Sequence, residues 1–146
     1  MTVTRDERVA CAVRIGELAV SGADAEAFAD VVDIENFRFH GPDGNESDHA
    51  GLVAYFATLR AAFDNLTLTR GIMLADGDYM AYQTHFGGTF AHEFTASPVG
   101  PLPPNGRHVR WDVINIVRLD GQGRVVEEWA QYDNRSFLRA LGAEGR

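Results

Sequence analysis

The stretch that decides the fold runs Arg124-Val-Val-Glu-Glu-Trp-Ala-Gln-Tyr-Asp-Asn-Arg-Ser-Phe-Leu-Arg-Ala-Leu-Gly142. It follows the turn Asp120-Gly-Gln-Gly123, and its first half predicts a strand. A short helix follows, with Gly142 as its stop. Because side chains on a strand alternate with a period of two, Trp129 and Asp133 share a face if the strand persists that far. The stretch thus predicts a carboxylate beside a large aromatic ring at a strand-to-helix junction.

Two interpretations of Asp133 follow from this placement. A carboxylate beside Trp129 loses water, and desolvation raises its pKa into the range of a usable general base. Alternatively, Asp133 caps the helix that follows it by accepting a hydrogen bond from a backbone N–H. The two roles are compatible, since a strand-to-helix junction can lie at the rim of a pocket.

The residues that precede this stretch alternate in the same way. Asp76-Gly77 is typical of a hairpin turn, and residues 97–106, which hold four of the five prolines, predict a loop. Gly87-Gly88 predicts a bulge or bend. The expected strands are 65–75, about 79–94, 108–119 and 124–131.

Helical patterns dominate the first half of the chain. Thr4 and Glu7 form a capping box, and Gly22 predicts the end of the first helix. A second short helix is expected from Asp24 to about Val31, a strand over residues 34–40, and a third helix capped by Ser47 or Asp48. Its apolar positions have helical spacing: Leu52, Tyr55, Phe56, Leu59 and Phe63.

Helices first and hairpin-linked strands afterwards predict an α+β architecture. We expect a curved, mostly antiparallel sheet wrapped around the N-terminal helices, with a cone-shaped cavity between them. A length of 146 residues predicts a single domain over 1–146.

The composition limits the kinds of molecule that the protein is expected to bind. The net charge of −8 at pH 7 argues against nucleic acid and against anionic membrane surfaces. The N-terminus lacks the apolar core of a signal peptide, so we expect a cytoplasmic protein. The five histidines are too dispersed to predict a metal site, and no nucleotide-binding loop is present.

Several segments together resemble the SnoaL-like polyketide cyclase family. They are Gly51 to Leu66, Gly88-Thr89 with Phe94, Pro103-Pro-Asn-Gly-Arg107, Ile116 to Gly121, and Glu128-Trp129 with Asp133, Leu138 and Leu141-Gly142. The resemblance covers roughly the last two-thirds of the chain. It implies a cone-shaped α+β barrel shared with ketosteroid isomerase, and a homodimer through the open sheet face.

The resemblance also implies a chemistry. Cyclases of the family close a ring by intramolecular aldol condensation, with an Asp as acid/base and no metal or cofactor. Asp133 is the residue that matches this Asp. Family members usually carry Gly-Thr-His in the second strand, where this chain has Gly88-Thr89-Phe90, so His85 and His92 are the expected substitutes.

Further side chains are candidates for binding a substrate. If the strand 108–119 is unbroken, Trp111 and Asn115 share one face, which predicts either a pocket wall or a dimer interface. The remaining candidates are His40, Tyr55, Phe56, Phe90 and Trp129.

The sequence therefore predicts a cofactor-independent cyclase or isomerase that acts on a small, apolar, carbonyl-rich molecule. Two alternatives stay open. One is a non-catalytic protein of the same fold that binds such a molecule, and the other is a hydrolase-like or hydroxylase-like relative.

Overall fold

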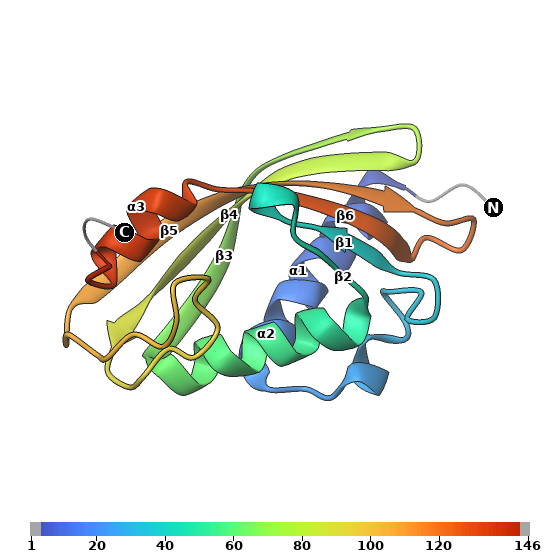
Figure 1. Cartoon of the computed structure of the whole chain (residues 1–146). Coiled ribbons are helices and arrows are strands. Elements are labelled where there is room, and N and C mark those ends of the chain that lie inside the picture. The colour runs from blue at the N-terminus through green and yellow to red at the C-terminus, as the bar shows by residue number, and fades with distance from the viewer. Residues whose placement is uncertain (1–3, 144–146) are drawn as a thin grey trace.

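The computed structural model describes residues 4–143, and these form an open, curved six-stranded sheet with helices against its concave face (Figure 1). The helices are α1 (Arg5–Ser21), α2 (His49–Ala62) and α3 (Asn134–Ala140), with 3-10 turns η1 (Ala25–Phe28) and η2 (Pro42–Gly44). The strands are β1 (Arg38–His40), β2 (Glu46–Ser47), β3 (Phe63–Asp76), β4 (Tyr79–Phe90), β5 (His108–Leu119) and β6 (Val125–Gln131).

The helices begin and end largely where the sequence predicts. Thr4 Oγ1 accepts a hydrogen bond from the Glu7 amide at 3.1 Å, and Gly22 ends α1 in the left-handed region at φ 81°. Asp48 caps α2 by accepting from the Gly51 amide at 2.8 Å. The expected second helix, from Asp24 to about Val31, is only the short 3-10 turn η1.

The sheet has the order β2-β1-β6-β5-β4-β3, and all pairs are antiparallel except β1 with β6. Two strand predictions are too long. The strand expected over residues 34–40 begins only at Arg38. The strand expected to reach Phe94 ends at Phe90, because the amides of Ala91 and His92 both bond to the Ala62 carbonyl instead.

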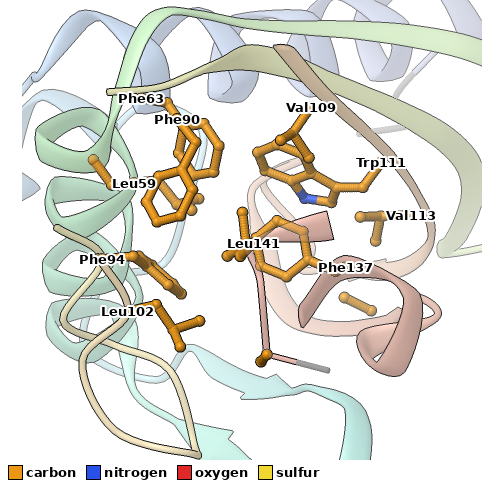
Figure 2. Packing of buried hydrophobic residues seen from close by; sticks show 13 residues of the cluster. Leu59, Phe63, Phe90, Phe94, Leu102, Val109, Trp111, Val113, Phe137 and Leu141 are labelled. Atoms are coloured by element: carbon orange, nitrogen blue, oxygen red, sulfur yellow. The ribbon is translucent and has the colours of Figure 1, made fainter. Parts of the chain in front are cut away.

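The concave face of the sheet is covered by α1 and α2, while α3 packs at the end where β5 begins (Figure 1). Under α3 lies an aromatic cluster, in which the Phe63 ring contacts those of Phe90, Trp111 and Phe137 (Figure 2). Trp111 and Phe137 also contact each other. The second apolar cluster lies between α1, η1 and the middle of the sheet. The predicted α+β architecture is confirmed, as a cone-like sheet that stays open rather than closing into a barrel.

The convex face of the sheet is exposed and partly apolar. Ile72 and Leu74 are each 64% exposed, Ile114 is 53% exposed, and Tyr79 and Ile116 are also exposed. This is the face through which family resemblance implies a homodimer, and that dimer stays a prediction. Within residues 4–143, no helix combines the length and the apolar character needed to cross a bilayer.

Candidate functional site: an aromatic cavity with a buried acid

A cavity of about 310 Å³ lies between the concave face of the sheet and helices α1 and α2. Pockets of a few hundred Å³ hold drug-sized ligands when apolar walls carry a few well-placed polar groups. The walls here are rich in aromatic rings, from elements spread over the chain: Phe28, Phe37, Phe39, Tyr55, Phe56, Phe86, Trp111 and Tyr132. A cavity with these walls favours a flat, apolar molecule.

Glu128 is the desolvated acid of this cavity, and β6 places it there. Glu46 also lines the cavity, but its side chain is 68% exposed and lies 3.3 Å from His40 Nδ1. Alternation on β6 sends Glu128 and Ala130 inward and the intervening Trp129 outward. Glu128 is paired across the sheet with Val117, and Ala130 with Asn115. Residues that pair across two strands share a face. Glu128 therefore lies on the same wall as Asn115.

A chain of four hydrogen-bonded side chains holds Glu128 in place. The Arg70 guanidinium donates to Thr84 Oγ1 at 2.6 Å, and the Thr84 hydroxyl donates to Asn115 Oδ1 at 2.6 Å. The Asn115 amide donates to Glu128 Oε2 at 2.8 Å. Every bond points its donor toward the carboxylate, so the chain orients Glu128 and stabilises its charged form.

Arg70 is itself fixed at the start of this chain. Its Nη2 and Nε donate to the Ala12 carbonyl at 2.9 and 3.2 Å, and its guanidinium carbon lies 4.6 Å from the centre of the Tyr82 ring. A planar guanidinium stacked on a ring and bonded at several nitrogens has little freedom left. The positive end of the chain is thus preorganised.

The electrostatics of Glu128 favour a base. Burial raises its pKa above the ordinary 4.5, while Arg70 and the bond from Asn115 act in the opposite direction. Glu128 lines the cavity and is partly accessible as a residue, while the protein around its carboxyl group desolvates it. Within residues 4–143 only Oε2 has a hydrogen-bond partner, which leaves Oε1 free to exchange a proton with a bound molecule.

Asp133 does not lie in this cavity, and the prediction of a desolvated base there is wrong. β6 ends at Gln131, so the strand alternation that would place Asp133 beside Trp129 does not extend to Asp133. Asp133 is exposed and caps α3, accepting from the Ser136 amide at 2.9 Å and from the Ser136 hydroxyl at 2.7 Å. These bonds lower its pKa instead of raising it.

Trp129 and His40, both predicted to bind substrate, lie on the convex side of the sheet. Their rings stack at 5.3 Å, and His40 Nε2 lies 2.7 Å from Glu127 Oε2. The two residues are paired between the parallel strands β1 and β6 and so point the same way. Neither lines the cavity, and the prediction that they do is wrong.

His85 and His92, the expected partners of the acid, also lie outside the cavity. His85 Nδ1 is 2.7 Å from Asp112 on the convex face. His92 Nε2 is 3.1 Å from Asp64, and its side chain is 62% exposed. Each histidine is held by an exposed carboxylate, and neither can reach a molecule bound near Glu128.

The other predicted binding residues divide into two groups. Trp111, Asn115, Tyr55 and Phe56 line the cavity, so the face of β5 that the sequence left open is the inner one. Phe90 does not line it. It is completely buried against Phe63, with ring centres 5.4 Å apart, and fills the core instead (Figure 2).

Sequence reasoning missed several polar residues of the cavity, among them Glu128, Tyr132 and His49. Glu127 and Glu128 are adjacent on β6, and neighbours on a strand point to opposite faces. One of the two carboxylates must therefore face inward, and it is Glu128. No group of three or more His, Cys, Asp or Glu suited to a metal ion occurs within residues 4–143.

Comparison with known proteins gives a consistent result. The model of a family described as SnoaL-like polyketide cyclase matches residues 11–141. A search among curated protein sequences found no match.

Solved structures share the fold. IdmH of Streptomyces antibioticus, a candidate polyketide cyclase, is 26% identical over 93% of this chain and 99% of its own, with a TM-score of 0.75. A candidate SnoaL-like polyketide cyclase of Jannaschia is 18% identical over 98% of both chains, with a TM-score of 0.78. AclR of Streptomyces galilaeus, a candidate hydroxylase, is 22% identical over 98% of this chain and 85% of its own, also with a TM-score of 0.78.

Proposed function

This chain belongs to the SnoaL-like polyketide cyclase family, and we propose that it catalyses cofactor-independent acid/base chemistry on an apolar, carbonyl-containing small molecule, with Glu128 as the base. One observation carries the proposal. The desolvated Glu128 carboxylate faces an aromatic cavity with one oxygen unbonded among residues 4–143, and its other oxygen is anchored by Asn115.

The reaction that this geometry supports begins at an acidic C–H beside a carbonyl. Glu128 Oε1 takes the proton, the C–H electron pair forms a carbon–carbon double bond, and the carbonyl electrons move to oxygen to give an enolate. In an aldol cyclisation, the enolate carbon then forms a bond to a second carbonyl carbon of the same molecule. The resulting alkoxide recovers the proton from the Glu128 carboxyl group, so the base is regenerated. In an isomerisation, the proton returns to a different carbon.

The cavity supplies what this chemistry needs. Burial makes Glu128 a stronger base than a surface carboxylate, and the chain from Arg70 keeps it oriented without protonating it. Aromatic walls offer a flat substrate apolar surface on which to stack, which raises the fraction of productive encounters.

The test measures proton exchange at carbon. 2-Tetralone is a bicyclic ketone with acidic protons beside its carbonyl, and their replacement by deuterium in D₂O is followed by NMR. We expect the protein to accelerate exchange, and Glu128→Gln to reduce that acceleration by about a hundredfold or more.

Glu127→Gln is the matched control, because it makes the same change one residue away on the opposite face of β6. It should exchange 2-tetralone at the rate of the unaltered protein. Exchange that survives in Glu128→Gln refutes Glu128 as the base. If the unaltered protein binds 2-tetralone without accelerating exchange, the non-catalytic binding protein becomes the better description.

A further inference from the structure

His49 is the buried polar residue of the cavity that the acid/base chemistry above does not use. It is the first residue of α2 and is only 2% exposed, yet it lines the cavity. Its ring lies between two aromatic side chains, with centres 4.9 Å from Phe28 and 5.6 Å from Phe37. The polar side chains on the sheet wall form hydrogen bonds with one another, whereas the His49 ring has no hydrogen-bond partner among residues 4–143.

The two ring nitrogens of His49 differ in their surroundings. Nδ1 is sealed from solvent and has no hydrogen-bond partner within the described part of the chain. Nε2 is likewise unbonded there but is not sealed, so it is the nitrogen that a molecule in the cavity can reach. Buried polar groups without partners are rare in native proteins and call for an explanation.

The state of the ring follows from this difference. Burial lowers the pKa of His49, which favours the neutral imidazole. A neutral imidazole carries one N–H and one lone pair. A sealed N–H without an acceptor is rarer in proteins than a sealed acceptor without a donor, so the proton belongs on Nε2. His49 then presents a single N–H donor to the cavity.

We propose that His49 is a ligand-binding residue whose Nε2–H donates a hydrogen bond to a carbonyl oxygen of the molecule in the cavity. The proposal rests on the proposed function only for the choice of a ketone as ligand. When Glu128 removes a proton beside that carbonyl, negative charge develops on the same oxygen. A fixed donor in a dry site stabilises such charge more than water does. The cavity thus selects a ketone over a hydrocarbon of the same shape.

The experiment compares two probes that differ by one oxygen, 2-tetralone and tetralin. We expect His49→Phe, which keeps a ring but removes the donor, to weaken 2-tetralone binding about tenfold, the effect of one hydrogen bond. Tetralin binding should stay unchanged, and His49→Gln, which restores an N–H, should recover part of the 2-tetralone affinity. His85→Phe is the control, a histidine replaced on the convex face.

A second measurement uses the unaltered protein, so it stands even if His49→Phe does not fold. Long-range proton–nitrogen correlation spectra of ¹⁵N-labelled protein should show His49 protonated at Nε2 and not at Nδ1. Adding 2-tetralone should shift the Nε2 resonance more than adding tetralin does.

Several results overturn the proposal. They are a proton on Nδ1, an equal loss of affinity for both probes in His49→Phe, no loss for either, or no binding of 2-tetralone at millimolar concentration. Failure of the proposed function looks different. In that case Glu128→Gln keeps its exchange rate while the discrimination between 2-tetralone and tetralin still depends on His49.

Discussion

Glu127 and Glu128 are adjacent, carry the same side chain and meet opposite environments. Glu127 lies on the convex face, where bonds from His40 and Arg118 lower its pKa. Glu128 lies on the concave face, where burial raises its pKa. Because successive side chains on a strand point to opposite faces, a shift of one position separates a surface ion pair from a cavity acid.

The comparison extends to the two faces of the whole sheet. The convex face carries side-chain pairs that reach solvent, among them His40 with Glu127, His85 with Asp112 and Arg118 with Glu127. The concave face carries the Glu128 carboxylate, set in an oriented chain of polar groups and lining a cavity rich in aromatic rings. Exposed pairs contribute little to stability, whereas an acid in a dry cavity acquires an altered reactivity. The chemical role of a side chain on this sheet therefore depends on the face that it occupies.

The largest difference between the faces should appear in packing. Phe90→Ala removes a completely buried ring from the concave side, and we expect a loss of about 3–5 kcal/mol of unfolding free energy. Ile114→Ala, on the convex side at 53% exposure, should change it by less than about 0.5 kcal/mol. Urea denaturation measures both. A comparable loss in the two variants is expected only if a second copy of the chain covers the convex face.

The next effect concerns the polar chain behind Glu128. Thr84→Val keeps the shape of the side chain but leaves the Asn115 oxygen and Arg70 Nη1 each without a partner, which should destabilise the fold by about 1–3 kcal/mol. Thr89→Val makes the same substitution on the other face of β4 and should be nearly neutral. Equal unfolding free energies for the two variants count against an oriented chain. The Thr84→Val protein should also exchange 2-tetralone more slowly, because Glu128 loses its orientation.

Much of the architecture was predictable from the sequence because local rules fixed it. The boundaries of β5 follow from strict alternation, and α1 follows from the cap at Thr4 and the stop at Gly22. The short elements were harder. β1 is held by pairing with β6, which is distant in sequence, so no local pattern limits it to residues 38–40.

The site was less predictable, because it depends on which face turns inward. Trp111 and Asn115 were recognised as sharing a face, but the helices that cover that face decide its role. The inward position of Glu128 can be deduced from that of Asn115 only when the register between β5 and β6 is known. That register has an irregularity between Arg118 and Leu119, which the sequence does not reveal. Asp133 was placed by extending the strand two residues beyond its end at Gln131.

The pH dependence of stability should separate the two glutamates. Because the folded-state pKa of Glu128 lies above its ordinary 4.5, the unfolded chain ionises first as pH rises, and the fold loses stability above pH 4.5. The stability of Glu128→Gln relative to the unaltered protein should therefore increase as pH rises above 4.5. The pKa of Glu127 is lowered, so its contribution is present above pH 4.5 and disappears as pH falls.

Glu127→Gln should accordingly be less stable than the unaltered protein above pH 4.5 and equal to it in acid. Chemical denaturation of both variants at a series of pH values measures the two trends. Parallel trends for the two variants are incompatible with opposite environments on the two faces.

The smallest effect is expected at Asp133. Its pKa is lowered by the bonds from Ser136, so its stabilising contribution is present above pH 3.8 and lost below it. Asp133→Ala removes the cap of α3 and should lower Tm by a few degrees, whereas Asp133→Asn keeps an acceptor oxygen and should lower it less. Neither change touches the cavity, so both variants should exchange 2-tetralone at the unaltered rate. Loss of exchange in Asp133→Asn, with Tm preserved, places the base on the outer rim after all and reverses the contrast between the two faces, because an exposed, hydrogen-bonded carboxylate would then outperform a desolvated one.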